Sequence, residues 1–249
     1  MGLTIRKALY SIFFPHICVM CGKYIGSDTD SVICDACQRT LPRTEQAQYD
    51  QNGTEMELLK VDPMRTRDTA AAMLHLKHIM HLNRAAAFLF YETGSPVQQM
   101  VHKMKYADRP EIGYQLGRMA ALEFQYADFF DGIDIIIPIP LHPKRLRERG
   151  YNQSEYIARG ISEITGIPID TTHVIRSRNT PKQALQRGEQ RLTNIAGAFE
   201  VNHPEQLYHK HILLVDDVIT TGETMRSCLS VMKRFRGATF TVFALCKAR

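Results

Sequence analysis

The sequence predicts an α/β protein, with a mostly parallel β-sheet covered by helices on both faces and a small cysteine-rich module in front of it. Two observations lead to this class. Apolar strands alternate with amphipathic helices over about the last two thirds of the chain, and four of the six cysteines fall within twenty residues near the start. With 44% apolar and 23% charged residues, the composition is that of a folded protein.

The first fourteen residues combine two basic side chains with a short apolar stretch. They lack the small-residue cleavage site of a signal peptide and lead directly into the cysteines. We therefore expect a short helix packed on its neighbour. No run approaches the roughly 20 apolar residues that a membrane span requires, so we expect a cytoplasmic protein without one.

The cysteines pair as Cys18-x2-Cys21 and Cys34-x2-Cys37, with twelve residues between the pairs. Two knuckles that each offer two thiolates fit a tetrahedral structural zinc site, and so short a segment needs the ion for its folding free energy. Gly22 follows the first pair, where the turn often needs a residue that tolerates positive φ. Two disulfides or a redox dithiol are the alternatives; the absence of a secretion signal and the paired motif favour zinc.

Three segments follow from these patterns. Residues 1–45 are predicted to form the N-terminal helix and the zinc-finger module. Residues 46–84 are polar and irregular in composition and are predicted to be a connecting or hood segment. Residues 85–249 are predicted to form the α/β domain.

The elements of the α/β domain follow from apolar runs and helical periodicity. A strand and two helices come first, and a second strand leads into a loop that ends at Arg149. Runs without alternation, such as Ile212 to Val215, are typical of strands buried on both faces of a parallel sheet. The predicted strands are 85–91, 133–139, 174–176, 198–201, 212–215 and 239–245, and the predicted helices are 96–105, 112–124, 152–165 and 223–235.

Two adjacent acids follow the strand Ile212 to Val215. Ligands of an open parallel sheet bind at the carboxyl ends of its strands, and Asp216 and Asp217 occupy that position. Adjacent carboxylates repel each other, and the sequence places no base beside them. A diol, which donates two hydrogen bonds, would satisfy both acids.

A phosphate site is predicted directly after the acids. Thr220, Thr221, Gly222 and Thr224 stand where the next helix begins. The N–H groups at the positive end of a helix dipole, together with three hydroxyls, would hold a phosphate, and Gly222 lets the backbone come close. A diol site beside a phosphate site describes a ribose 5-phosphate.

Basic residues gather in two segments. Lys144 to Gly150 carries a net charge of +3 and Arg176 to Arg191 one of +4, whereas the whole chain carries +5. A polyanion is expected beside these segments. The modest overall charge gives no argument for nucleic-acid binding.

These motifs together resemble a known family. The segment Ile212 to Thr224 fills every position of the phosphoribosyl-pyrophosphate signature of type I phosphoribosyltransferases. With the paired cysteines, motifs in the same order over nearly the whole chain are similar to those of the ComF family of competence-associated, phosphoribosyltransferase-like proteins. These further motifs are Lys105-Tyr106, Ile137 to Arg145, Arg149 to Gln153, Gln183, Arg187, Arg191 and Asn194.

The resemblance implies a type I phosphoribosyltransferase-like, Rossmann-like fold with a site in three parts. The phosphoribosyl-binding part would be Asp216, Asp217, Val218, Ile219, Thr220, Thr221, Gly222 and Thr224. The pyrophosphate loop would be Leu141, His142, Pro143, Lys144 and Arg145. The mobile loop and the pocket would contribute Arg149, Tyr151, Asn152, Gln183, Arg187 and Arg191, of which Arg149, Tyr151 and Asn152 could line the pocket or anchor the loop.

The resemblance also implies a reaction. Mg²⁺ would accompany phosphoribosyl pyrophosphate (PRPP), the acids would position the sugar and its metal, and a nitrogen nucleophile would replace pyrophosphate at ribose C1. No residue identifies the acceptor, and no catalytic residue is assigned, since a loop histidine such as His142 is more often exposed than a general base.

The alternative is a non-catalytic protein of the competence machinery. Such a protein would sense a phosphosugar or a nucleotide, or handle single-stranded DNA, and the zinc module would dock protein partners. Tyr106 and Tyr151 are the only aromatic residues near the basic segments in the sequence, so support for base stacking on DNA is weak.

Overall fold

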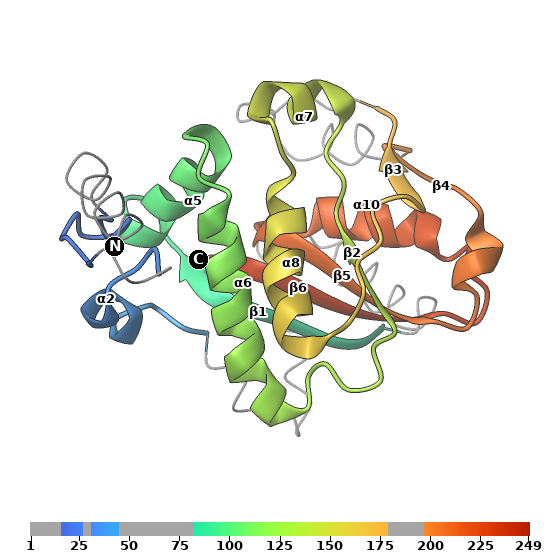
Figure 1. Cartoon of the computed structure of the whole chain (residues 1–249). Coiled ribbons are helices and arrows are strands. Elements are labelled where there is room, and N and C mark those ends of the chain that lie inside the picture. Colours follow the sequence, from blue (N-terminus) through green and yellow to red (C-terminus); the bar gives the residue numbers. More distant parts are fainter. Residues whose placement is uncertain (1–15, 27–30, 45–81, 179–196) are drawn as a thin grey trace, which may run out of the picture.

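The computed structural model describes residues 16–26, 31–44, 82–178 and 197–249. The described part centres on a four-stranded sheet in the order β1-β6-β5-β2 (Figure 1). All three neighbouring pairs are parallel. The strands are β1 (Leu82–Tyr91), β2 (Ile135–Pro138), β5 (His211–Ile219) and β6 (Thr239–Ala248).

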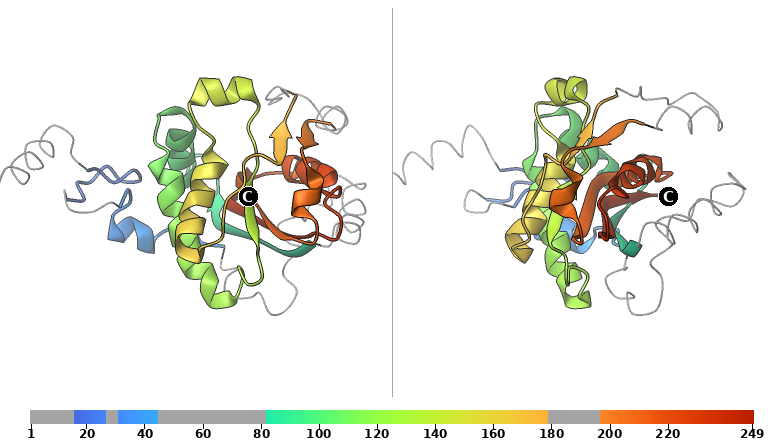
Figure 2. Two further views of the ribbon diagram at one scale, coloured as in Figure 1. Left: turned by 45° about the vertical axis from the view of Figure 1, so that its right-hand side comes forward. Right: turned by 90° about the vertical axis from the view of Figure 1, so that its right-hand side faces the viewer.

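Helices cover both faces of this sheet. The pair α6 (Glu111–Phe124) and α8 (Gln153–Thr165) lies on one face, and α10 (Glu223–Met232) lies on the other (Figure 2). A Cβ on Gly117 of α6 would lie 2.3 Å from the Ile157 carbonyl oxygen of α8, so glycine permits the close contact between these helices. The two helical layers with the sheet between them confirm the predicted fold class.

The core lies where the sequence predicts it. Leu213 and Leu214 of β5 and Val242 and Phe243 of β6 have no exposed surface. Their strands are central in the sheet, with a helical layer on each side, which explains the continuously apolar stretches Ile212 to Val215 and Val242 to Cys246. The short 3₁₀ helices η3 (Gln125–Ala127) and η4 (Pro204–Leu207) connect elements at the periphery.

The strands β3 (Val174–Arg176) and β4 (Phe199–Val201) correct the prediction that they belong to the parallel sheet. They form a separate two-stranded antiparallel sheet. In each strand the central residue is exposed and its neighbours are buried. One-sided burial suits an antiparallel pair that packs on α10, whereas a strand inside the parallel sheet is covered on both faces.

The segment predicted as a loop up to Arg149 contains a helix, α7 (Pro143–Arg149). His142 is its N-cap and accepts a hydrogen bond from the N–H of Lys144 at 3.1 Å. Pro143 occupies the first helical position, and Gly150 ends the helix with φ of 80°. These two residues were the sequence signals for the helix that the prediction overlooked.

The strand β5 runs four residues beyond the predicted end at Val215. The register continues because β6 stays alongside, pairing Asp216 with Ala244 and Val218 with Cys246. The two acids therefore lie within the last part of the strand rather than after it. The helix α10 ends at Met232, three residues before the predicted Phe235.

The cysteine-rich module, which contains α2 (Asp35–Arg39), lies beside β1, α5 (Pro96–Tyr106) and α6 (Figure 1). Arg43 pairs antiparallel with Leu89 of β1, and its guanidinium forms an ion pair with Glu123 of α6 at 2.8 Å. Lys103 Nζ of α5 donates to the Val19 carbonyl at 2.8 Å. The module is therefore joined to the edge of the sheet by backbone and side-chain contacts.

Two predicted segments fall largely outside the described residues. They are the N-terminal helix within residues 1–15 and the connecting segment, of which residues 46–81 are not described. Within the described ranges, no helix is both long enough and apolar enough to span a bilayer.

Candidate functional site

The acids at the end of β5 each have defined partners. Asp216 Oδ1 accepts hydrogen bonds from Ser154 Oγ at 3.2 Å and from the N–H of Asp217 at 2.8 Å. Asp217 forms an ion pair with Lys105, whose Nζ lies 3.0 Å from Oδ1 and 2.9 Å from Oδ2. The two side chains of this ion pair are only 20% and 13% exposed. The sequence placed no basic partner beside the acids, but the structure provides one. It is Lys105, from the last turn of α5, 112 residues before Asp217.

Burial and charge shift the pKa values of this group. Burial, and then repulsion by Asp217, raise the pKa of Asp216 to about 7. Burial alone would lower the pKa of Lys105, but attraction to Asp217 outweighs it and raises that pKa. At neutral pH the site therefore combines a charged Lys105–Asp217 pair with a carboxyl group that is only partly ionised.

The predicted phosphate loop follows β5 and leads into α10. Gly222 is the N-cap of α10 with φ of 73°, and its carbonyl accepts the N–H of Arg226 at 2.9 Å. The N–H groups of the first turn have no acceptor within the helix and carry the positive end of its dipole. Thr220 is exposed, and Thr221 and Thr224 are half-buried. The positions match the predicted arrangement, and phosphate binding itself stays a prediction.

Two members of this predicted set differ in their surroundings. Val218 is half-buried, whereas Ile219 is 3% exposed and belongs to the core. Ile219 can therefore contribute to a ligand site only through its backbone.

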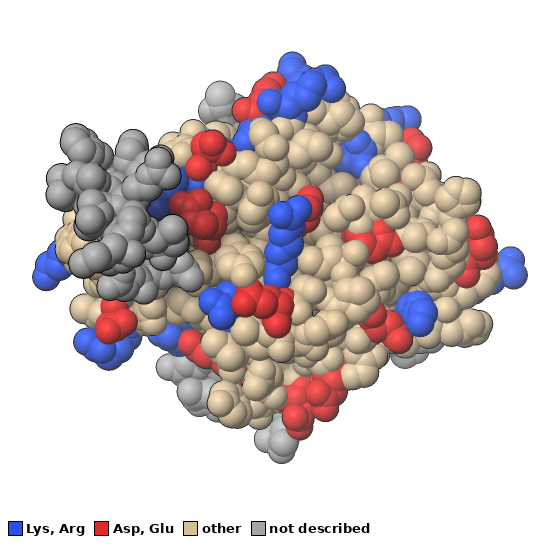
Figure 3. Space-filling view, in the orientation of Figure 1, with Lys and Arg blue, Asp and Glu red and all other residues tan. Residues whose placement is uncertain are grey.

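The predicted pyrophosphate loop is the start of α7, at one end of the molecule, where Figure 3 shows basic side chains gathered. Lys144 is exposed, but its N–H is taken by His142 Nδ1 and is no longer a donor for phosphate. Arg145 is half-buried, and burial followed by repulsion from Arg149 lowers its pKa. Leu141 is half-buried and Pro143 exposed. Arg145 lies within electrostatic reach of Arg176, which is itself attracted by Asp216.

Arg149 connects α7 with the end of α5. Its Nη1 donates to Gln153 Oε1 at 2.6 Å, and its guanidinium lies over the ring of Tyr106, 5.3 Å from the centroid. Tyr106 is 49% exposed. Arg149 also repels Lys105, so its charge lies close to the ion pair with Asp217.

Tyr151 and Asn152 act as structural anchors. The Tyr151 hydroxyl donates to the Met104 carbonyl in α5. Asn152 is the N-cap of α8, and its Nδ2 donates to the Ile139 carbonyl at 3.0 Å. Of the two roles left open by the sequence, lining the pocket or anchoring the loop, these contacts are those of an anchor. Gln183, Arg187 and Arg191 lie outside the described residues.

Two residues not predicted as site members contact or neighbour the acids. Ser154 donates to Asp216, as described above. Arg176 of β3 is 8% exposed, its guanidinium lies 5.1 Å from the Phe199 ring centroid, and it is attracted by Asp216 and repelled by Arg145. The only sequence signal for Arg176 was its position at the start of a basic segment.

An open cavity of about 590 Å³ lies beside α5. Lys105 belongs both to this cavity and to the ion pair with Asp217. The rings of His102 and Tyr106 are 4.8 Å apart between centroids and offer flat surfaces at the wall. The lining residues are Tyr91, Gln98, Gln99, Val101, His102, Lys103, Lys105 and Tyr106.

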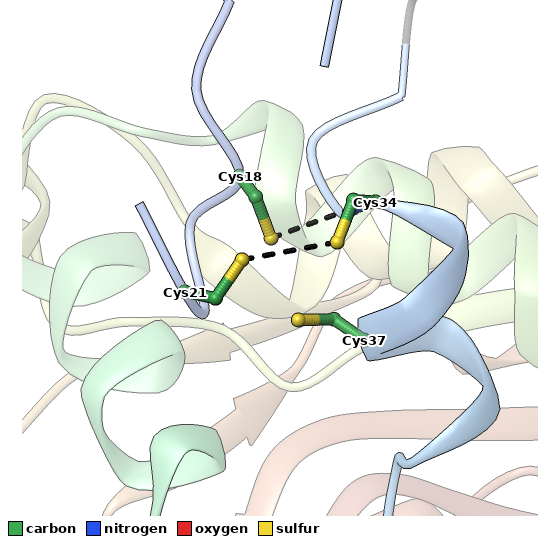
Figure 4. Close-up of side chains that lie close together, drawn as sticks. All are labelled: Cys18, Cys21, Cys34 and Cys37. Carbon is green, nitrogen blue, oxygen red and sulfur yellow. Dashed lines mark hydrogen bonds between the residues drawn. The ribbon is translucent and has the colours of Figure 1, made fainter. Parts of the chain in front are cut away.

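The four clustered cysteines converge as predicted (Figure 4). Their sulfur atoms all lie within 4.8 Å of one another, and Cys21 Sγ and Cys34 Sγ are 3.8 Å apart. A tetrahedral ion with Zn–S bonds of about 2.3 Å separates its sulfurs by roughly 3.8 Å, whereas a disulfide holds them at about 2.05 Å. The sulfur geometry therefore fits a metal ion such as zinc rather than disulfides.

One thiol of the cluster favours its anionic form, whereas burial and the neighbouring cysteines raise the pKa of Cys37. Burial opposes ionisation of Cys18, but hydrogen bonds from the N–H groups of Cys34, Cys21 and Met20 outweigh it and lower the pKa of Cys18 to about 6. The thiolate is the form that binds a metal. Gly22 has φ of 73°, which confirms the predicted turn.

Unlike the cysteines, Asp216 and Asp217 do not form a set of free ligands that could hold a Mg²⁺ ion. Both oxygens of Asp217 face the ammonium of Lys105. Among the described residues, the four cysteines are the one group of three or more potential ligands with converging atoms.

Comparisons with known proteins identify the family of this chain. Residues 150–249 match the phosphoribosyl transferase domain family. The DNA utilization protein YhgH of Shigella flexneri is 33% identical over 155 residues, which cover 61% of this chain and 67% of the relative. Competence protein F of Haemophilus influenzae is 27% identical over 157 residues, covering 61% and 69%. The chain belongs to the ComF family. Its phosphoribosyltransferase-type domain thus includes α8, β5, α10 and β6.

Solved structures show more distant likenesses. The allosteric regulatory enzyme of purine biosynthesis is 20% identical, with a TM-score of 0.34, over 52% of this chain and 25% of that one. A hypoxanthine-guanine-xanthine phosphoribosyltransferase is 15% identical, with a TM-score of 0.32, over 57% and 66%. Likenesses of this size add nothing to an assignment of function.

Proposed function

We propose that this ComF protein binds PRPP and transfers its phosphoribosyl group to a nitrogen acceptor, with release of pyrophosphate. The observation that carries the proposal is the arrangement at the end of β5. Asp216 and Asp217 stand at the carboxyl edge of the sheet, and the N-terminus of α10 follows them directly. Arg176 lies within electrostatic reach of Asp216, and Arg145 lies within reach of Arg176.

The chemistry would divide among these groups. The carboxylates would accept hydrogen bonds from the ribose hydroxyls, and the start of α10 would hold the 5-phosphate. The bond between C1 and the pyrophosphate oxygen would break with its electron pair on pyrophosphate, where Arg145 and Arg176 would stabilise the charge. A bond from the acceptor nitrogen to C1 would form, and that nitrogen would release its proton to solvent.

The acceptor would enter through the cavity beside α5. Lys105 links this cavity to the acid pair, and the rings of His102 and Tyr106 suit a planar base. The test compares the affinities of ribose 5-phosphate and of nucleoside 5′-monophosphates by calorimetry. His102→Ala should leave ribose 5-phosphate binding unchanged and abolish any additional affinity of the nucleotide. An additional affinity that survives in the variant would place the base elsewhere.

The central experiment is calorimetric titration of the full chain with PRPP. Asp216→Asn combined with Asp217→Asn should weaken binding at least tenfold, because both acceptors for the diol become neutral. Asp131→Asn, the same change at an exposed position, is the control. Equal affinity of the double variant and the wild type would show that the site lies elsewhere. Pyrophosphate release, measured across a panel of bases and amines, tests turnover separately.

A second candidate function is a non-catalytic role in the competence machinery, as a sensor of a phosphosugar or as a handler of single-stranded DNA. The relatives' names, DNA utilization protein and competence protein, motivate it. Tyr106 is exposed, Arg149 lies over its ring, and the basic helix α7 is next to it; this arrangement would offer a stacking surface for a base. Filter binding of a single-stranded oligonucleotide across a salt series tests this role. An affinity that is absent or independent of salt would exclude it.

We further propose that Zn²⁺ is the ion held by Cys18, Cys21, Cys34 and Cys37, where it would cross-link the two knuckles. The module would then be a rigid surface for protein partners of the competence machinery. A cytoplasmic location is consistent with this function and stays a prediction.

A further inference from the structure

We propose that the site binds its phosphoribosyl ligand without a divalent cation, because Lys105 and the neighbouring arginines supply the positive charge that a metal would otherwise bring. The inference rests on the proposed function, because it concerns the same ligand. It departs from the expectation that Mg²⁺ accompanies PRPP at this site.

The first support is the position of the Lys105 ammonium. Its Nζ lies 2.9 and 3.0 Å from the two oxygens of Asp217, on the side that a cation bound to this carboxylate would occupy. A Mg²⁺ ion demands an octahedral set of oxygens at about 2.0–2.1 Å. It would also be repelled by an ammonium held against the same carboxylate.

Asp216 does not provide the missing ligands. Its Oδ1 already accepts two hydrogen bonds, from Ser154 Oγ and from the N–H of Asp217. One carboxylate oxygen remains, and the raised pKa of Asp216 weakens it further as a ligand for a hard cation. The acid pair is therefore better suited to hydroxyl donors than to a metal ion.

Lys105 is held in place by its helix. Met100 and Met104 of α5 have no exposed surface, and the Met104 carbonyl accepts the Tyr151 hydroxyl. A fixed ammonium loses little conformational entropy when a ligand binds, whereas a metal has to be recruited from solution.

The wider charge balance favours an anionic ligand without a metal. Lys105 and Arg149 repel each other, Arg149 and Arg145 repel each other, and Arg176 is attracted by Asp216. Glu148 attracts Arg145, so these four cations stand against three carboxylates and leave a formal charge of +1 around the site. Phosphate and pyrophosphate groups are the counter-charges that such a site attracts.

The experiment is calorimetric titration of the full-length wild type with PRPP and, separately, with ribose 5-phosphate, in EDTA and in millimolar Mg²⁺. We expect the wild-type affinities to agree within about threefold between the two conditions. In EDTA, Lys105→Met should bind at least tenfold more weakly, and Mg²⁺ should restore most of the loss. Lys210→Met removes the same charge at a lysine that forms an ion pair with Asp134, just before the start of β5 and away from the acids at its end, and is the matched control.

Two results would overturn the proposal. One is a wild-type affinity that falls more than about tenfold in EDTA, a comparison that needs no variant and so does not depend on folding of Lys105→Met. The other is a folded Lys105→Met protein that binds as tightly as the wild type in EDTA. Absence of binding by the wild type under both conditions would instead reject the proposed function itself.

Discussion

The cysteine cluster and the acid pair are both groups of potential anions, and each has one member with a raised pKa, Cys37 and Asp216, but they differ in the partners of the other members. Around Cys18 the partners are neutral backbone N–H groups, which lower the pKa of the thiol to about 6 without cancelling its charge. Beside Asp217 a full positive charge is present in Lys105, while the pKa of Asp216 rises to about 7. Backbone N–H groups and the other cysteines are the partners of Cys18 and Cys37, whereas a lysine ammonium lies against the acid pair.

The largest expected effect concerns the cluster. Cys34→Ser should lower bound zinc from about one equivalent to near zero after dialysis against a chelator, and residues of the module should become sensitive to protease, because the ion supplies their folding free energy. Elemental analysis and limited proteolysis measure this. Cys228→Ala, a cysteine buried in α10, is the control and should retain the metal. Full zinc content in Cys34→Ser would show that the cysteine cluster does not hold the metal.

Removal of Lys105 is expected to have the next largest effect. Lys105→Met leaves Asp217 only 13% exposed and without its ion-pair partner, which should lower the free energy of unfolding by about 2–3 kcal/mol. Adding Asp217→Asn should recover most of this loss, because no unpaired charge then remains. Urea unfolding of the two single variants and the double variant gives the coupling free energy. Additive effects would mean that the ion pair is not energetically significant.

A smaller effect should follow the ionisation of Asp216. Its pKa in the folded protein, about 7, lies above the reference value of 3.8, so the folded state binds more protons between these values, and stability falls as the pH rises through this range. Asp216→Asn should therefore raise the free energy of unfolding by about 1–2 kcal/mol at pH 8 and by less at pH 5. Urea unfolding at the two pH values tests this. Equal gains at both would contradict the raised pKa.

The smallest effect concerns the contact between the two regions. Glu123→Gln removes one charge of the ion pair with Arg43, whose side chains are 35% and 30% exposed, and should lower stability by about 0.5–1 kcal/mol without loss of zinc. Thermal unfolding and elemental analysis measure the two quantities. Loss of zinc in this variant would show that the module depends on its contact with α6.

The sequence by itself determined the features that depend on local pattern. Ile212 to Val215 could be recognised as a buried strand because each residue of a central strand faces a helical layer, so polar alternation disappears. The cysteine cluster was equally readable, since two short knuckles fix their own geometry. In α7 the local signals, Pro143 and Gly150, were present in the sequence but were outweighed by the expectation of a loop.

Only the tertiary structure decided which charges meet. Lys105 and Asp217 are 112 residues apart in the chain, and the nearness of Arg176 to Asp216 depends on a β3–β4 pair that lies outside the main sheet. No periodicity records such contacts, because electrostatic interaction depends on distance in space and on burial, and both are set by packing. The sequence could therefore supply the two acids of the candidate site, while the fold alone supplied the cation that pairs with Asp217.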